Sequence, residues 1–575
     1  MSRRAFGWSF AAIAVVALAL RLVFPTADPP WETTVGIVWH DEGAWVHNAR
    51  NMALFGTWAT DAWNPMFIAP VFTLLEYLSF ATFGVGVWQA RLVSELTGFA
   101  SVLLLALGVS RLAGREAGVI AAALAATNYV YVMWNRAALM EASMVAFIVA
   151  SWYCYVRAQK QSGFGLLAAA FALLAYFTKA AAIFFVAALG LEAVVAIVIA
   201  RAGGADHRDG RAAMMTLAGL AGFGILALAT FVAPNWADYR FYNWQMSVTR
   251  KPSYDMRSLL NRVTWFPIVH DIFTRMWFTV VVGLLGLAGV AARWRTVSAG
   301  ERLLAWWMTL GALELILHDV GNERRFVFFI PALVALTAIV LGRDRRLLPE
   351  AVLQLPRIAR VVAAPVVLYA AYVVCGALLR LAFLYEPGPG VRLSAAVALG
   401  VTALLFATWP RLPRFLVGAP MRTSSVLLLA GLVTAGQVAQ FGQWARGRTY
   451  KNYLASVELG TVLPPGTLVH GKLANGLSLE NRIRPVFVGT NFGNYADRKQ
   501  RDDVRYILTY IVPRIGYEGS VIRDVLDAYP QRTIIKTFDV AESTGGRDRA
   551  ALIDKFGGAS PGNPRAPGQD QRAHD

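Results

Sequence analysis

The sequence is poor in charge, in cysteine and in histidine. Only 16% of its 575 residues are charged, and it contains 2 cysteines and 7 histidines. Both cysteines, Cys154 and Cys375, lie inside apolar runs, which argues against a disulfide framework and a cysteine-ligated metal. No Gly-rich phosphate loop occurs, so a nucleotide site is not indicated. We expect no cofactor. No His/Asp cluster has ligand spacing, so no metal site is assigned, although metal dependence stays open.

Apolar residues dominate instead. They make up 57% of the chain, and the mean hydropathy is +0.48. Apolar runs of roughly 17–25 residues recur between Phe6 and Phe441, long enough to cross about 30 Å of hydrocarbon. The first run follows Arg3 and Arg4 and has no A-x-A-like cleavage site after it. We therefore predict a polytopic membrane protein whose first segment is a retained anchor.

Positive charge is abundant, with a formal net charge of +18. It concentrates in alternate short loops, such as those at Arg111–Arg115 and Arg343–Arg360. This is the pattern of cytoplasmic loops in membrane proteins. No basic stripe or aromatic stacking platform is visible, so we expect no nucleic acid partner.

Two segments are ambiguous, and loop charge decides the first of them while length decides the second. If Met66–Gly84 crossed the membrane, every later basic loop would face outward, so we predict an interfacial helix there, with Glu76 on its wet face. The apolar stretch 163–201 is too long for one crossing and is predicted to be two spans that meet at Thr178-Lys179. The total is about 13 spans, and this odd number puts the C-terminus outside.

The predicted fold is an all-α polytopic membrane domain of about 13 helices with outer-face juxtamembrane helices, followed by a small α/β domain. The membrane domain covers 1–442, including a first outer loop at 25–87. The extracytoplasmic domain covers 443–554, because strand-like segments such as "RPVFVGT" and "RTIIKTFDV" surround an amphipathic "SVIRDVLDAY". Residues 555–575 are rich in Gly, Pro and polar side chains and are predicted to be disordered.

The stretch "IVWHDEGAWVHNARNMALFGTW" places Asp41 just before an amphipathic helix predicted at 42–55, with Glu42 at its start and Gly56 as its C-cap. One interpretation is structural, because Asp41 would cap the helix and Glu42 would complement its dipole. The other interpretation is functional, because further charged side chains are predicted at the same outer face. These are Arg136, Glu141, Lys179, Arg257, Arg262, His318, Arg324 and Arg325.

Each of these residues also has an ordinary structural reading, such as a snorkelling side chain for Lys179. Together they predict a cavity at the outer leaflet with carboxylates on one side and cations around it. A phosphate on a lipid needs cations at the membrane surface. A hydroxyl acceptor needs a base. Transfer of a sugar from a polyprenyl phosphate uses both and needs no nucleotide site.

Several segments resemble a known family in their order along the chain. They are "WHDEGAWVHNARNMALFGTW", "WNPMFIAP", "FGVGVWQARLVSELTG", "YFTKAAAIFF" and "RRFVFFIPALVAL". This set resembles the membrane half of C-type glycosyltransferases, in the branch of the bacterial lipid A aminoarabinose transferases and protein mannosyltransferases. The resemblance covers about 1–345 and the general plan of the tail.

The resemblance implies roles for particular residues. Asp41 and Glu42 match the acidic pair that acts as base or orients the acceptor, and Glu141 matches the acid that follows an arginine, here Arg136. Many relatives carry Lys or His before the loop proline, where this chain has Asn64. The donor phosphate is therefore assigned to other cations, and Arg136 and His318 are assigned supporting roles. The phosphate-binding candidates are Lys179, Arg257, Arg262, Arg324 and Arg325.

We thus expect a multi-pass enzyme of the bacterial inner membrane, an inverting hexosyl- or pentosyltransferase. Its partners would be a polyprenyl-phosphate-linked sugar, membrane lipids, and a glycan, lipid or protein acceptor. The main alternative is a transporter or flippase of a lipid-linked sugar, which Glu192 inside a predicted span favours. A non-catalytic scaffold, which would tolerate a neutral residue at Asp41, is a third possibility.

Overall fold

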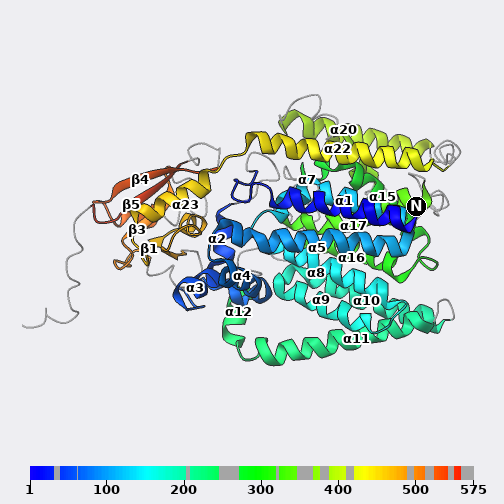
Figure 1. Cartoon of the computed structure of the whole chain (residues 1–575), viewed down its shortest axis with the longest axis horizontal. Coiled ribbons are helices and arrows are strands. Elements are labelled where there is room, and N and C mark those ends of the chain that lie inside the picture. Colours follow the sequence, from blue (N-terminus) through cyan, green and yellow to red (C-terminus); the bar gives the residue numbers. More distant parts are fainter. Residues whose placement is uncertain are drawn as a thin grey trace, which may run out of the picture.

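The computed structural model is mostly helical, with one small sheet near the C-terminus (Figure 1). It describes residues 1–30, 39–60, 63–202, 207–244, 271–318, 323–345, 367–375, 387–408, 420–487, 498–511, 523–541 and 549–557. The long helices are α1 (Arg3–Leu22), α5 (Val87–Ala113), α6 (Arg115–Thr127), α8 (Met140–Ala158), α9 (Phe164–Thr178), α10 (Ile183–Arg201), α11 (His207–Ala227), α15 (Trp277–Ala292), α16 (Ala299–His318), α17 (Phe329–Ile339), α20 (Pro387–Thr408) and α22 (Thr423–Gly447).

Shorter elements connect them. They are α2 (His40–Trp45), α3 (His47–Phe55), η1 (Pro65–Phe67), α4 (Pro70–Phe83), α7 (Tyr129–Asn135), η2 (Ala180–Ala182), η3 (Leu228–Val232), α12 (Trp236–Trp244), α14 (Asp271–Arg275), η6 (Glu323–Phe328) and η7 (Val340–Asp344). Among the described residues, six helices are long and apolar enough to cross a membrane. A seventh is counted if α6 and α7, bent by 61°, form one span. The chain is therefore a multi-pass membrane protein, and the total of about 13 spans stays a prediction because parts of the predicted spans 361–384 and 391–409 lie outside the described ranges.

The structure can be compared with the predictions for two ambiguous apolar segments, the stretch around Lys179 and helix α4. Helix α9 ends at Thr178, Lys179 is extended (φ −158°), and α10 follows after a short 3-10 turn, so the predicted break is confirmed. Helix α4 has 14 residues, which at 1.5 Å per residue gives about 21 Å, less than a bilayer crossing. Its Glu76, expected on the wet face, is instead fully buried, because α4 packs against α3, α5 and α9.

The C-terminal α/β domain begins with α23 (Lys451–Val462) and contains α24 (Lys472–Gly476). Its five strands are β1 (Leu468–His470), β2 (Arg484–Val486), β3 (Tyr506–Tyr510), β4 (Thr533–Asp539) and β5 (Arg549–Asp554), in the sheet order β2-β1-β3-β5-β4. The first three strands are mutually parallel, and β5 runs antiparallel to β3 and β4. Strand β5 was not predicted, because its alanines have low strand propensity. This domain and helices α2–α4 lie at the same end of the molecule, opposite the N-terminus (Figure 1).

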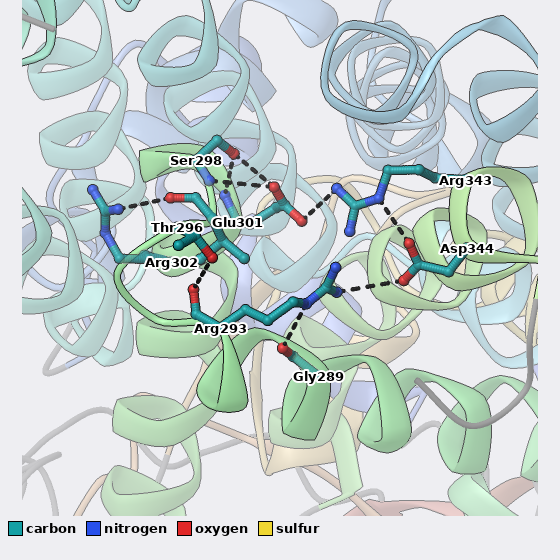
Figure 2. Close-up of polar contacts among 9 residues, drawn as sticks. Gly289, Arg293, Thr296, Ser298, Glu301, Arg302, Arg343 and Asp344 are labelled. Carbon is teal, nitrogen blue, oxygen red and sulfur yellow. Dashed lines mark hydrogen bonds and ion pairs between the residues drawn. The ribbon is translucent and has the colours of Figure 1, made fainter. Parts of the chain in front are cut away.

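Ion pairs join the helix ends on the N-terminal side of the bundle. Figure 2 shows Arg343 between Glu301 and Asp344, at 2.8 and 3.0 Å, and Arg293 3.4 Å from Asp344. Ser298 and Glu301 form a capping box at the start of α16, with Ser298 Oγ donating to the Glu301 carboxylate at 2.9 Å. The contacts tie α15, α16 and η7 together.

Glu192, the residue that favoured a transporter, has a structural partner. Arg302 of α16 donates from Nε to its two carboxylate oxygens at 3.0 and 3.2 Å, and its Nη2 lies 2.9 Å from Oε1. Both side chains are buried, at 0% and 4% exposure. The pair joins α10 to α16. The buried carboxylate of Glu192 is explained by this pair, so it no longer supports the transporter alternative.

This pair predicts a stability effect without a catalytic one. Glu192→Gln keeps the side-chain size but leaves the Arg302 charge buried without its partner. The free energy of unfolding should fall by about 3–5 kcal/mol. Thermal unfolding in detergent measures the loss, and the double variant Glu192→Leu with Arg302→Met should recover most of it. Unchanged stability in the single variant would contradict this assignment.

Candidate functional site

The opening motif folds into two short helices rather than one. Helix α2 ends at Trp45, and α3 begins after Val46, whose φ of −92° and ψ of 3° interrupt the helix. Gly56 ends α3 in the left-handed conformation (φ 71°), as the sequence predicts for a C-cap. Asp41 does not cap the helix. It is the second residue of α2, and the N-cap position is held by Trp39 without a side-chain hydrogen bond.

Asp41 instead belongs to a cluster of charged side chains from four separate elements. Arg324 in η6 donates from Nη1 to Asp41 Oδ2 at 2.8 Å. Its Nε lies 3.7 Å from Oε1 of Glu141, in the first turn of α8. Lys179, in the break between α9 and η2, donates to the same Glu141 oxygen. Two carboxylates and two cations thus form one chain of contacts, which we call the charge cluster.

The charge cluster is mostly shielded from solvent. Side-chain exposure is 1% for Glu141, 11% for Asp41, 12% for Lys179 and 20% for Arg324. Burial lowers the pKa of Lys179 to about 8, and the neighbouring Glu141 carboxylate opposes that shift. The formal charges of the four side chains balance. An anion that entered would therefore compete with the two carboxylates for the same two cations.

Glu42 lies beside the cluster but is committed to other contacts. Arg91 of α5 donates to its two oxygens in a bidentate pair, at 2.8 Å each. The backbone N–H of Ala138 donates to Oε1, also at 2.8 Å. The same arginine donates to the carbonyls of Pro25 and Ala27. Glu42 therefore joins α2 to α5 and to the segment that precedes α8.

The other predicted site residues are distributed more widely. Arg325 lies 3.9 Å from Glu314 of α16. Arg136 donates to the carbonyls of Leu20, Arg21 and Phe24 and lies over the Trp444 ring, so it fastens the end of α1. Arg257 and Arg262 lie outside the described residues, and so does the side chain of His318 at the end of α16.

The contacts of two further residues, Arg91 and Asn64, were not predicted from the sequence. Arg91 was missed, although a lone arginine early in an apolar span is a signal for a buried partner. Asn64, where the resemblance predicts a cation, accepts from Asn48 and donates to the Tyr242 hydroxyl at 3.0 Å. Within the described ranges, no group of three or more His, Cys, Asp or Glu side chains is placed to hold a metal ion.

The chain is similar to a known protein family and to solved membrane-protein structures. Residues 67–226 match the family of dolichyl-phosphate-mannose-protein mannosyltransferases. Curated proteins give no match. The structure of ArnT from Cupriavidus metallidurans bound to undecaprenyl phosphate is 18% identical, with a TM-score of 0.56 over 97% of this chain and 100% of that one. Its apo structure is 17% identical, with a TM-score of 0.57 over the same shares. The predicted resemblance to C-type glycosyltransferases is therefore confirmed, by the family match over residues 67–226 and by a fold shared with ArnT.

Proposed function

We propose that this chain is an integral membrane glycosyltransferase. It moves a monosaccharide from a polyprenyl-phosphate donor to a hydroxyl group of a glycan, lipid or protein on the outer face of the bacterial inner membrane. The charge cluster of Asp41, Arg324, Glu141 and Lys179 carries this proposal. It combines a candidate base with two cations, and α2, which carries Asp41, lies at the end of the bundle near the α/β domain (Figure 1).

The relatives support the choice of donor. ArnT shares the fold and was solved with undecaprenyl phosphate bound. The family matched by residues 67–226 is described as dolichyl-phosphate-mannose-protein mannosyltransferases, and dolichyl phosphate is a lipid phosphate of the same kind. A donor of this kind carries its phosphate at the membrane surface, where Lys179 and Arg324 can bind it by charge-assisted contacts.

The chemistry we propose is a single displacement. The acceptor oxygen attacks the anomeric carbon and its proton passes to Asp41. The bond from the anomeric carbon to the phosphate oxygen breaks, and polyprenyl phosphate leaves with the electron pair, stabilised by Lys179 and Arg324. Attack opposite the leaving group inverts the anomeric centre. Glu141 orients Lys179, and Glu42, held by Arg91, is a positioning residue rather than a second base.

The contacts also suggest an order of events. Arg324 is paired with Asp41, and Lys179 is paired with Glu141. A bound phosphate would draw both cations toward itself and weaken these pairs, so Asp41 would become a better base only after the donor had bound. Transfer assays with purified protein, polyprenyl-phosphate sugars and envelope extracts test the proposal. Absence of transfer from all such donors would refute it.

Lys179 gives this function a pH signature. The ammonium is charged below its pKa of about 8 and loses its proton above it, so donor binding should weaken as pH rises through that value. In the profile of kcat/KM, which reports groups of the free enzyme, we expect an alkaline limb near pH 8. Lys179→Arg keeps the charge to higher pH and should move this limb upward. A limb that stays in place in this variant would assign it to another group.

A further inference from the structure

The α/β domain contacts the elements that carry the candidate site. Several of these contacts are made by residues 475–483, which run from the last two residues of α24 to the start of β2 and which we call the docking loop. This loop reaches α2, which holds Asp41 and Glu42. It also reaches α3 through Arg50 and α5 at Val87. Three contacts of different chemistry therefore join one loop to three neighbouring elements of the membrane domain.

Arg50 makes the first contact. Its side chain is fully buried on α3 and donates to three backbone carbonyls of the docking loop. Nε donates to Ser478 at 3.0 Å, and Nη2 donates to Asn481 at 2.9 Å and to Ile483 at 3.0 Å. A planar guanidinium that reaches three carbonyls fixes both the distance and the orientation of the loop.

Two glycines make the second contact, where backbone meets backbone. A Cβ atom on Gly43 would lie 1.9 Å from the carbonyl oxygen of Asn475. A Cβ atom on Gly476 would lie 2.5 Å from the Trp39 ring and 2.7 Å from the Cα atom of His40. No side chain fits at either position. The docking loop therefore presses directly on the residues that flank Asp41.

The third contact reaches the helix that holds Glu42. Glu480 Oε1 accepts from the backbone N–H of Val87, the first residue of α5, at 2.7 Å. A carboxylate at this position complements the positive end of the helix dipole. Arg91, one turn further along α5, forms the bidentate pair with Glu42. Glu480 thus ties the docking loop to the second support of α2.

Helix α2 needs such support. It has six residues and no side-chain cap at its N-terminus. Helices this short do not hold their conformation in water without tertiary packing. Trp39, which precedes α2, belongs to the same buried apolar cluster as Leu473, Leu477 and Ile483 of the α/β domain. The domain therefore supplies a large part of the packing that keeps Asp41 in place.

We propose that the docking loop positions α2 for catalysis, with Arg50 as the positioning residue, so that sugar transfer depends on the seated α/β domain. This inference rests on the proposed function, because it concerns the reach of Asp41 to the acceptor. Neither Arg50 nor the docking loop belongs to the charge cluster that binds the donor. Their loss should therefore lower kcat and leave the KM for donor nearly unchanged.

Kinetics of Arg50→Ala and Gly476→Ala test the proposal. Because displacements of about 1 Å can cost about 10²-fold, we expect kcat to fall by about 10- to 100-fold in both variants. Arg50→Lys, which keeps the charge and folds more readily, should lie between Arg50→Ala and wild type. Arg505→Ala, which breaks the Arg505–Asp554 pair inside the domain, and Gly447→Ala, which meets no atom within 4 Å, serve as matched controls with near-wild-type kcat.

Hydrogen exchange separates this proposal from the function it builds on. Backbone amides of α2 should exchange faster in Arg50→Ala and Gly476→Ala than in wild type. In the controls Arg505→Ala and Gly447→Ala, their exchange rates should equal those of wild type. If wild type transfers sugar while both variants keep full kcat, the positioning role is wrong and the proposed function stands. If wild type transfers none, the function fails, and unchanged exchange in the variants would then also reject the docking role.

Discussion

Asp41→Asn is expected to slow sugar transfer by about 10²–10⁴-fold. Asparagine keeps the size of the side chain and can still accept the hydrogen bond from Arg324, but it cannot take up a proton. Loss of a helix cap does not explain such an effect, because the N-cap position of α2 is held by Trp39 and Asp41 is the second residue of the helix. Initial rates with donor and acceptor both saturating would measure the change in kcat.

Asp344→Asn is the matched control for this prediction. It makes the same chemical change in another carboxylate that pairs with arginine, here with Arg293 and Arg343 (Figure 2). Its transfer rate should stay near that of wild type. Glu141→Gln tests the competing assignment. A larger loss at Glu141 than at Asp41, in folded protein, would move the role of base to Glu141.

Arg324→Ala is expected to lower catalytic efficiency for the donor by about 10- to 100-fold. A charge-assisted contact to phosphate contributes about 1.5–3 kcal/mol, which corresponds to that range. Arg324 contacts both Asp41 and Glu141, so it lies where the donor phosphate must meet the base. The KM for donor should rise more than the KM for acceptor, and both are measured by varying one substrate at a time.

The adjacent Arg325 provides the control. Its guanidinium lies 3.9 Å from Glu314 of α16, whereas the contacts that define the charge cluster come from Arg324. Arg325→Ala should therefore reduce stability more than donor use. Equal donor defects in both variants would show that the two arginines act together on the phosphate, and an unchanged donor KM in Arg324→Ala would remove Arg324 from the donor site.

Local signals in the sequence predicted the features that depend on neighbouring residues. A polar Thr-Lys pair inside an apolar run marks the break at Lys179, because a charged side chain is costly inside the bilayer. Gly56 marks the end of α3 because glycine adopts a positive φ without strain. Each of these arguments uses residues that are close together in the chain.

The pairing of side chains could not be predicted in the same way. Glu42 and Arg91 are 49 residues apart in the chain, and Glu192 and Arg302 are 110 residues apart. Which acidic side chain pairs with which arginine is therefore decided by the packing of the helices. Likewise, Arg324 and Arg325 are equivalent in sequence, and the 3-10 turn η6 directs them to different partners. The sequence predicted that the residues of the charge cluster lie at one face of the membrane domain. The contacts between them could be identified only from the folded structure.

Mass spectrometry of co-purifying lipids tests the central claim most directly. The slow Asp41→Asn variant should retain its donor, so we expect a polyprenyl-phosphate monosaccharide in its lipid extract. Arg324→Ala should carry little or none, because it lacks one of the two cations that bind the phosphate. The mass of the retained lipid would also identify the sugar class. A complete lack of polyprenyl-phosphate species in wild type and Asp41→Asn, or equal amounts in Arg324→Ala, would contradict the account.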